Sequence, residues 1–249
     1  MRLTRIHVPE PLAEGQEIVL PTQSAEHLTR VLRLEAGAPF VVFDGRGHEY
    51  AAVLGARHGK QVRARVEREV PVQRESPLDV TLLQGIARGE RMDLIVQKAT
   101  ELGVARIVPF TAERSVVRVD AKQRERKLEH WQAVAISACE QSGRNHVPPV
   151  SAPGSLQHAL DALPGDSLRC LLAAEGAESL VAVATRSPGR PCVLLIGPEG
   201  GLSHAEETLA LANRFVACRL GPRVLRTETA GLAALAALQA IGGDFNDAG

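Results

Sequence analysis

The sequence predicts an α/β protein with a parallel sheet, preceded by a small β-rich module that contains one helix. After residue 77, apolar runs of strand length alternate with helical patterns, which is typical of a parallel sheet covered by helices. Before residue 71, short apolar runs are separated by turn residues. The polar segment 71–77 between them is bracketed by prolines and indicates a domain boundary. We therefore expect one domain at residues 1–72 and a second at residues 73–249.

The N-terminal module has the pattern of a mostly β structure. Strands are expected at residues 18–20, 40–43, 50–54 and 62–70. The last of these alternates apolar and charged residues, which is the period of a half-exposed strand. Ser24 is expected to cap a single helix that places Leu28, Val31 and Leu32 on one apolar face.

The C-terminal part alternates between the two kinds of element. Strands are expected at residues 80–83, 105–110, 168–174, 192–196 and 216–220. Helices are expected at residues 90–102, 120–142 and 229–241, and a short one after the capping box of Ser203 and Glu206. The strand at 192–196 is apolar throughout, as a strand buried on both faces requires.

Composition limits the class of protein. Hydrophobic residues make up 45% of the 249 residues, which is enough for a substantial core. Basic and acidic residues number 29 each, so a general binder of polyanions is not indicated, although a local basic face stays open. No apolar stretch reaches the length of a membrane span and no secretion signal begins the chain, so we expect a soluble, cytoplasmic protein without membrane contact.

Metal and redox sites are not indicated either. The cysteines are too scattered for a zinc knuckle or a redox pair, and we expect buried apolar side chains in a reducing compartment. The eight histidines show no spacing typical of metal ligands, so no metal is expected. The cysteines are Cys139, Cys170, Cys192 and Cys218.

Three loops that follow expected strands are the candidates for a binding site. They cover residues 171–176, 196–203 and 220–230, and they meet at one edge if the strands are parallel. The second loop is rich in glycine, which lets the backbone approach a ligand, and a helix with free amide groups follows it. An ordinary glycine-rich turn would give the same pattern.

The third loop is more polar than a turn requires. Arg223, Arg226, Thr227, Glu228 and Thr229 lie together directly before an apolar helix. A solvated loop with a threonine cap is the alternative. The glycine patterns of phosphate-binding loops and of dinucleotide-binding folds are absent, as is the serine elbow of esterases.

Residues 196–201 and 220–230 together resemble the signature of the RsmE-type enzymes, which methylate N3 of a uridine in 16S ribosomal RNA and belong to the SPOUT superfamily. The resemblance covers nearly the whole chain in order, and its joint set of motifs is specific. One departure is Val224, where isoleucine is common. Further matching blocks lie at residues 5–9, 27–33, 98–104, 109–115 and 140–148.

The resemblance implies a fold that the periodicity cannot give. The C-terminal domain would be a SPOUT α/β domain with a deep trefoil knot, and the N-terminal domain a PUA-like β-barrel that binds RNA. It implies S-adenosyl-L-methionine as the cofactor and 16S ribosomal RNA as the substrate, in the assembled small ribosomal subunit. It also implies a homodimer formed through the knot region and the last helix.

The same resemblance implies the residues of the site. Leu172, Gly197, Leu220 and Leu225 are expected to enclose the adenine and ribose of the cofactor, with Glu199 and Gly201 close by. Ala173 and Val224 complete the expected cofactor site.

Transfer of a methyl group to uracil N3 requires that N3 lose its proton. Arg144 is the first candidate for stabilising the resulting anion, and Arg226 is the second. Glu228 is the candidate proton acceptor, and capping of the last helix is an equally good explanation for this residue. The candidate phosphate contacts to RNA are Arg5, Arg30, Arg33 and Arg114.

Three alternatives remain open at this point. Another SPOUT enzyme would methylate the ribose 2′-oxygen. A non-catalytic assembly factor would bind RNA without transferring a methyl group, although the polar third loop speaks against it. A phosphate-binding hydrolase lacks the lysine or metal ligands that its chemistry needs.

Overall fold

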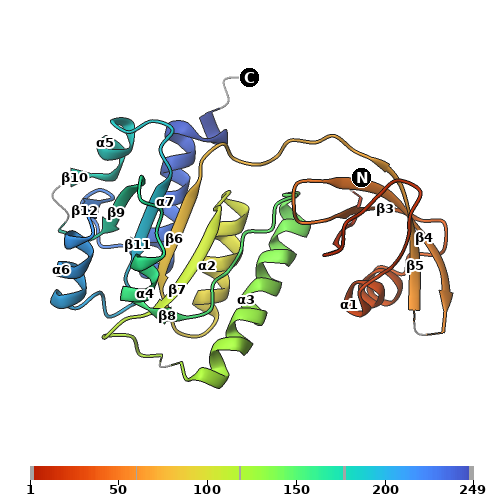
Figure 1. The fold of residues 1–249 in the computed structure, drawn as a ribbon, viewed down its shortest axis with the longest axis horizontal. Coiled ribbons are helices and arrows are strands. Elements are labelled where there is room, and N and C mark those ends of the chain that lie inside the picture. The colour runs from red at the N-terminus through yellow and green to blue at the C-terminus, as the bar shows by residue number, and fades with distance from the viewer. Residues whose placement is uncertain (1–2, 60, 118, 176–177, 247–249) are drawn as a thin grey trace. The chain divides into compact units, whose positions relative to one another are not determined.

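The computed structural model describes residues 3–59, 61–117, 119–175 and 178–246 (Figure 1). The chain divides into two compact units, and each is described by itself. The first consists of Met1–Glu75 with Cys139–Val147, and the second of Ser76–Ala138 with Pro148–Gly249. Residues 139–147, which the sequence analysis assigns to the second domain, thus cluster with the first unit. The domain limits 1–72 and 73–249 stay a prediction.

The first unit is built on a five-stranded mixed sheet around one apolar core. Only the β1–β3 pair is parallel among the described strands of this sheet. On β5, Val62, Ala64 and Val66 point inward and charged residues point outward, which confirms the half-exposed strand. In sheet order the strands are β1 (Arg5–His7), β3 (Pro39–Phe43), β4 (Glu49–His58), β5 (Gln61–Glu69) and β2 (Glu17–Val19).

The helix of this unit differs from the expectation. It begins as α1 (Thr22–Glu26) and continues as a π-helical turn, η1 (His27–Val31). Leu28 is fully buried, but Val31 is 67% exposed. The expected apolar face is therefore wrong in part, because the wider π-helical turn changes the spacing between these side chains.

Buried charges tie the ends of the first unit together. Arg5 is buried and donates hydrogen bonds to Glu49 and to Asn145 Oδ1, the latter at 2.6 Å. Arg74 donates to the same Glu49 carboxylate at 2.8 Å. Burial alone would raise the pKa of Glu49, but the hydrogen bonds and charges of Arg5 and Arg74 outweigh it and hold that pKa below its ordinary value.

A second buried pair attaches the segment Cys139–Val147. Arg144 donates from Nε and Nη2 to Glu75 Oε2 at 2.9 and 2.8 Å. The other oxygen of Glu75 accepts the backbone N–H groups of Asn145 and His146. Burial would raise the pKa of Glu75, but these hydrogen bonds and the Arg144 charge lower it overall. These contacts explain why residues 139–147 belong with the first unit.

The second unit is the predicted parallel α/β layer. Its seven strands are all parallel, and β11 lies between β9 and β6. Every expected strand of this part is present. In sheet order they are β10 (Glu178–Ser179), β12 (Val216–Arg219), β9 (Leu168–Leu172), β11 (Cys192–Ile196), β6 (Val80–Gly85), β7 (Arg106–Thr111) and β8 (Gly154–Ser155).

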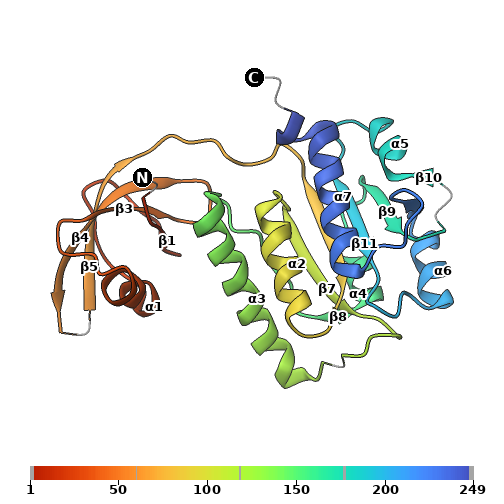
Figure 2. The same cartoon turned by 180° about the vertical axis from the view of Figure 1, so that it is seen from behind.

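Helices cover both faces of this sheet. One face carries α2 (Glu90–Glu101), α5 (Leu180–Thr185), α7 (Thr227–Gly242) and most of α3 (Ala121–Ser142), of which Figure 2 shows α2, α3 and α7. The other face carries α4 (Leu156–Asp161) and α6 (His204–Ala212), where a second apolar core lies. A 3-10 turn, η2 (Asp244–Asn246), follows α7. The short elements β1, β8, β10, α4 and α5 were not expected from the sequence.

Two local predictions are confirmed at the level of single residues. Ser203 and Glu206 form the capping box at the start of α6. All four cysteines are buried free thiols, and burial is the largest cause that raises the pKa of Cys139 to about 12. The described helices include none long and apolar enough to cross a membrane.

The first unit should lose stability in acid. Glu49 and Glu75 hold their protons less tightly when folded, so their contribution is complete above the ordinary carboxyl pKa of 4.5. This contribution to stability should disappear as the pH falls through the lowered pKa values that the two carboxyl groups have in the folded protein. Urea unfolding at a series of pH values measures this. The Glu49→Gln variant should lose about 3–5 kcal/mol at pH 7 and show a shallower dependence on pH.

Glu17→Gln provides the control for this prediction. Glu17 pairs with Arg63 at the surface, and both side chains are exposed. The change should cost no more than about 1 kcal/mol, and the pH dependence should stay that of the unchanged chain. An equal loss in both variants would contradict the role given to the buried pair.

Candidate functional site

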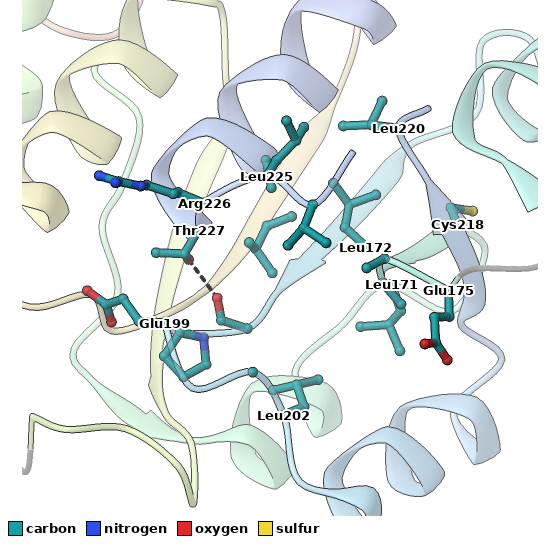
Figure 3. A pocket seen from close by; sticks show the side chains of 18 of the residues that line it. Leu171, Leu172, Glu175, Glu199, Leu202, Cys218, Leu220, Leu225, Arg226 and Thr227 are labelled. Atoms are coloured by element: carbon teal, nitrogen blue, oxygen red, sulfur yellow. Dashed lines mark hydrogen bonds between the residues drawn. The ribbon is translucent and has the colours of Figure 1, made fainter. Parts of the chain in front are cut away.

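The three loops predicted from the sequence enclose one cavity in the second unit. They follow β9, β11 and β12, which are neighbours in the parallel sheet, so their carboxyl ends open at the same edge. The cavity has a volume of about 900 Å³, and Figure 3 shows how its side chains surround it. All the residues that line it belong to the second unit.

One side of the cavity is apolar. Leu171, Leu172, Leu220 and Leu225 gather there from the first and third loops (Figure 3). Ile196 at the end of β11 lines the cavity as well. A flat, mostly apolar ring system is the kind of ligand group that such a surface binds.

Glycine is required where the second loop packs against the sheet. A Cβ on Gly85, at the end of β6, would lie 2.6 Å from the ring of Pro198. A Cβ on Gly197 would lie 3.2 Å from the backbone of Gly201 and Leu202. The loop therefore closes on itself and on the sheet more tightly than other residues allow, which leaves its backbone groups at the cavity.

Thr227 joins the second and third loops. Its hydroxyl donates to the carbonyl oxygen of Gly197 at 2.6 Å, which Figure 3 marks with a dashed line. The same hydroxyl accepts a hydrogen bond from the side-chain amide of Gln84 at 2.9 Å. Gln84 is fully buried at the end of β6. A single threonine thus fixes the entry to α7 against the sheet and the glycine-rich loop.

Charged residues from three elements meet at another part of the cavity wall. Arg91 on α2 donates to Glu199 at 2.9 Å, and its Nε lies 3.9 Å from Glu228 on α7. The backbone N–H of Arg88 also donates to Glu199. Burial acts to raise the pKa of Glu199, but hydrogen bonds from Arg88 and Arg91 lower it overall. The Oε2 atom of Glu228 is buried, and no described residue hydrogen-bonds to it.

The structure brings most of the predicted site residues together. Arg226 and Glu228 line the cavity, and so do all eight residues expected to bind the cofactor. Val224 lines it although it is 81% exposed. Their roles stay predictions. The eight are Leu172, Ala173, Gly197, Glu199, Gly201, Leu220, Val224 and Leu225.

Arg144 is not among the residues that line this cavity. It belongs to the first unit, where it is buried and bound to Glu75. Its catalytic role stays a prediction.

The four arginines predicted to contact RNA differ in exposure. Arg30, Arg33 and Arg114 are exposed, and Arg30 pairs with Glu26 one helical turn away. Arg5 is buried within its own unit and bonded to Glu49. This placement does not favour a phosphate contact from Arg5, because its guanidinium already neutralises a carboxylate.

Two residues of the site were missed by the sequence reasoning. Arg91 lies 108 residues before Glu199, and no local pattern connects them. Gln84 is the last but one residue of β6, and the apolar run before it gave no reason to single out one polar residue. Only the fold brings these residues to the loops. Among the described residues, no group of histidine, cysteine, aspartate and glutamate is arranged to hold a metal ion.

Comparison with known protein families assigns the class of the chain. Residues 74–239 match a family described as an RNA methyltransferase domain, and residues 20–67 match an RNA methyltransferase PUA domain. The predicted α/β methyltransferase domain and the PUA-like N-terminal module are thereby confirmed, and the class is that of RNA methyltransferases.

Individual relatives agree with this class over almost the full length. Ribosomal RNA small subunit methyltransferase E of Bacillus subtilis is 34% identical over 92% of this chain and 92% of its own length. The crystal structure of the protein of that name from Neisseria gonorrhoeae, bound to S-adenosyl methionine, is 40% identical with a TM-score of 0.90, covering 98% of this chain and 100% of that one. A putative methyltransferase from Legionella pneumophila, in complex with the same cofactor, is 38% identical with a TM-score of 0.92, at the same coverage.

The chain therefore belongs to the ribosomal RNA small subunit methyltransferase E family.

The hydroxyl of Thr227 should be needed to hold the loops. Thr227→Val keeps the shape of the side chain but leaves the Gly197 carbonyl and the Gln84 amide without this partner. The free energy of unfolding, measured in urea, should fall by about 1–3 kcal/mol. Thr229→Val, at an exposed position of the same helix, is the control and should change it little. Equal effects of the two changes would contradict a role for the buried hydroxyl.

Proposed function

We propose that this protein transfers a methyl group from S-adenosylmethionine to N3 of a uridine in 16S ribosomal RNA, within the assembled small subunit. The observation that carries the proposal is the cavity formed by the three loops, in a chain of the methyltransferase E family. The relatives' names support a ribosomal RNA substrate, and two structural relatives contain the cofactor. The choice of uracil N3 rests on the resemblance of the motifs.

The residues present fit this cofactor. Leu172, Leu220 and Leu225 line the cavity and are proposed to contact the adenine, and the glycine-rich loop is proposed to offer backbone groups to its polar edges. Glu228 has a buried carboxylate oxygen without a hydrogen-bond partner among the described residues, which suits a ligand that carries positive charge. When bound, the cofactor supplies a methyl group on an electrophilic sulfonium.

The chain's own residues then have to position uracil and remove its proton. We assign the proton acceptor to Glu228, because its carboxylate is mostly buried in the cavity wall. Arg226 is exposed and lines the same cavity, and we assign to it the stabilisation of the uracil anion. Arg144 is the alternative for this second role. Its pairing with Glu75 means that a test by Arg144→Ala needs a parallel measurement of folding.

RNA binding and assembly complete the proposal. The exposed Arg30, Arg33 and Arg114 are proposed to contact phosphates, each adding to affinity without reading the sequence. The target uridine would be turned out of its strand to reach the cavity. We also propose that the protein forms a homodimer. We propose a cytoplasmic location, because the ribosomal subunits of bacteria, the source of the relatives, are found there.

Identification of the product tests the proposed function directly. The purified protein would be incubated with labelled S-adenosylmethionine and with small subunits that lack the modification, and the RNA digested to nucleosides. We expect labelled N3-methyluridine. A ribose-methylated nucleoside would overturn the N3 assignment, and no transfer to subunits or free RNA would overturn the proposed activity.

Glu228→Gln tests the proton acceptor. The amide keeps the size of the side chain but cannot take a proton at neutral pH, so kcat should fall by about 10²- to 10⁴-fold. Binding of the cofactor, measured by calorimetry, should persist. Glu129→Gln on the exposed surface of α3 is the control and should leave kcat unchanged. A Glu228→Gln variant with normal kcat would show that the residue only caps the helix.

A further inference from the structure

A chain of contacts connects the glycine-rich loop to Glu228 through a residue of another helix. The backbone N–H of Arg88 donates to Glu199 at 3.0 Å, just before α2 begins. Arg91, in the first turn of α2, donates from Nη1 to the same Glu199 oxygen at 2.9 Å. Glu199 is therefore held from two directions by one short segment.

Arg91 also faces Glu228. Its Nε lies 3.9 Å from Glu228 Oε1, which is beyond hydrogen-bond length but within the distance of an ion pair. The side chain of Glu228 is only 14% exposed. Since Nη1 is bound to Glu199, the rest of the guanidinium is fixed in orientation and keeps its Nε side toward Glu228.

The surroundings of Glu228 make this charge matter. The other charged residues that line the cavity are Glu175, Glu199, Glu207, Arg223 and Arg226. Among the described residues, Arg91 forms the ion pair with Glu228. Arg91 is exposed, as are Arg223 and Arg226, but Arg91 is held by Glu199, whereas the other two have no ion pair among the described residues.

We propose that Arg91 is a positioning residue for the methyl transfer: anchored by Glu199, it places a positive charge beside the Glu228 carboxylate and holds that carboxylate in place at the cavity wall. The proposal rests on the proposed function, because it gives Arg91 a role through the proton acceptor. It also gives Glu199 a task of its own, which is to orient Arg91.

The first test needs no catalysis. The carboxyl carbon of Glu228 would be followed by NMR in the ligand-free protein at neutral pH, with the signal identified by its loss in Glu228→Gln. Arg91→Gln should move and broaden this signal, because the carboxylate loses the charge that holds it in one position. Arg91→Lys should restore most of the original signal, because the positive charge returns.

The second test separates positioning from general damage to the site. In Arg91→Gln, kcat should fall by about tenfold, because the carboxylate is no longer held in position, and Arg91→Lys should restore most of it. Affinity for S-adenosylmethionine should change by no more than about fivefold, as for the loss of a partly exposed ion pair. Arg190→Gln is the matched control. Its side chain is also 45% exposed and paired with a carboxylate, Asp166, away from the cavity.

The outcomes are distinct from those of the proposed function. If the unchanged protein transfers no methyl group, the proposed function fails, while the NMR signal of Glu228 still tests the contact with Arg91. If Arg91→Gln leaves both the Glu228 signal and kcat unchanged, the inference fails even though the enzyme is active. A loss of cofactor affinity with an unchanged Glu228 signal would make Arg91 a structural residue only.

Discussion

The parallel order of β12, β9 and β11 is the constraint on which the site depends. Parallel neighbours end at the same edge of a sheet, so loops that are distant in sequence are brought to one place. The chain then has to return from β12 to lay α7 against the sheet, and the return passes through this edge. Thr227 fixes that return, because it bonds the Gly197 carbonyl and the Gln84 amide at once. The cavity is thus a consequence of topology, and one buried hydroxyl holds two of its loops together.

The two units are stabilised in different ways. The second unit has apolar cores on both faces of a buried sheet and needs few internal charges. The first unit is small, and it attaches a distant segment, Cys139–Val147, through the buried arginines Arg5 and Arg144. Buried ion pairs add little net stability compared with apolar packing. They do disfavour other arrangements of the chain, because any other arrangement would leave a buried charge without its partner.

Much of this could be predicted from the sequence, and the exceptions have physical reasons. The run 192–196 is apolar throughout, so β11 and its burial followed directly, and the glycine-rich and polar loops indicated the cavity. Strands of two residues, such as β8 and β10, carry no period to recognise. The π-helical turn at His27–Val31 changes which side chains face the core, and nothing in the apolar pattern of this segment indicates such a turn. Arg5 looked like a surface arginine because nothing local shows that Glu49 lies against it.

Arg91 shows most clearly where sequence reasoning ends. Its position in the first turn of a helix gives no sign of function, since arginine is common on exposed helix faces. Only the fold places it between two carboxylates that come from a loop and from another helix. One guanidinium then serves two acidic groups, so the wall of the cavity keeps a net negative charge. That excess suits a cofactor that carries a positive sulfonium, while the guanidinium of Arg91 lies between the two carboxylates. In the proposed function, the same three side chains would therefore serve both the binding of a cation and the removal of a proton.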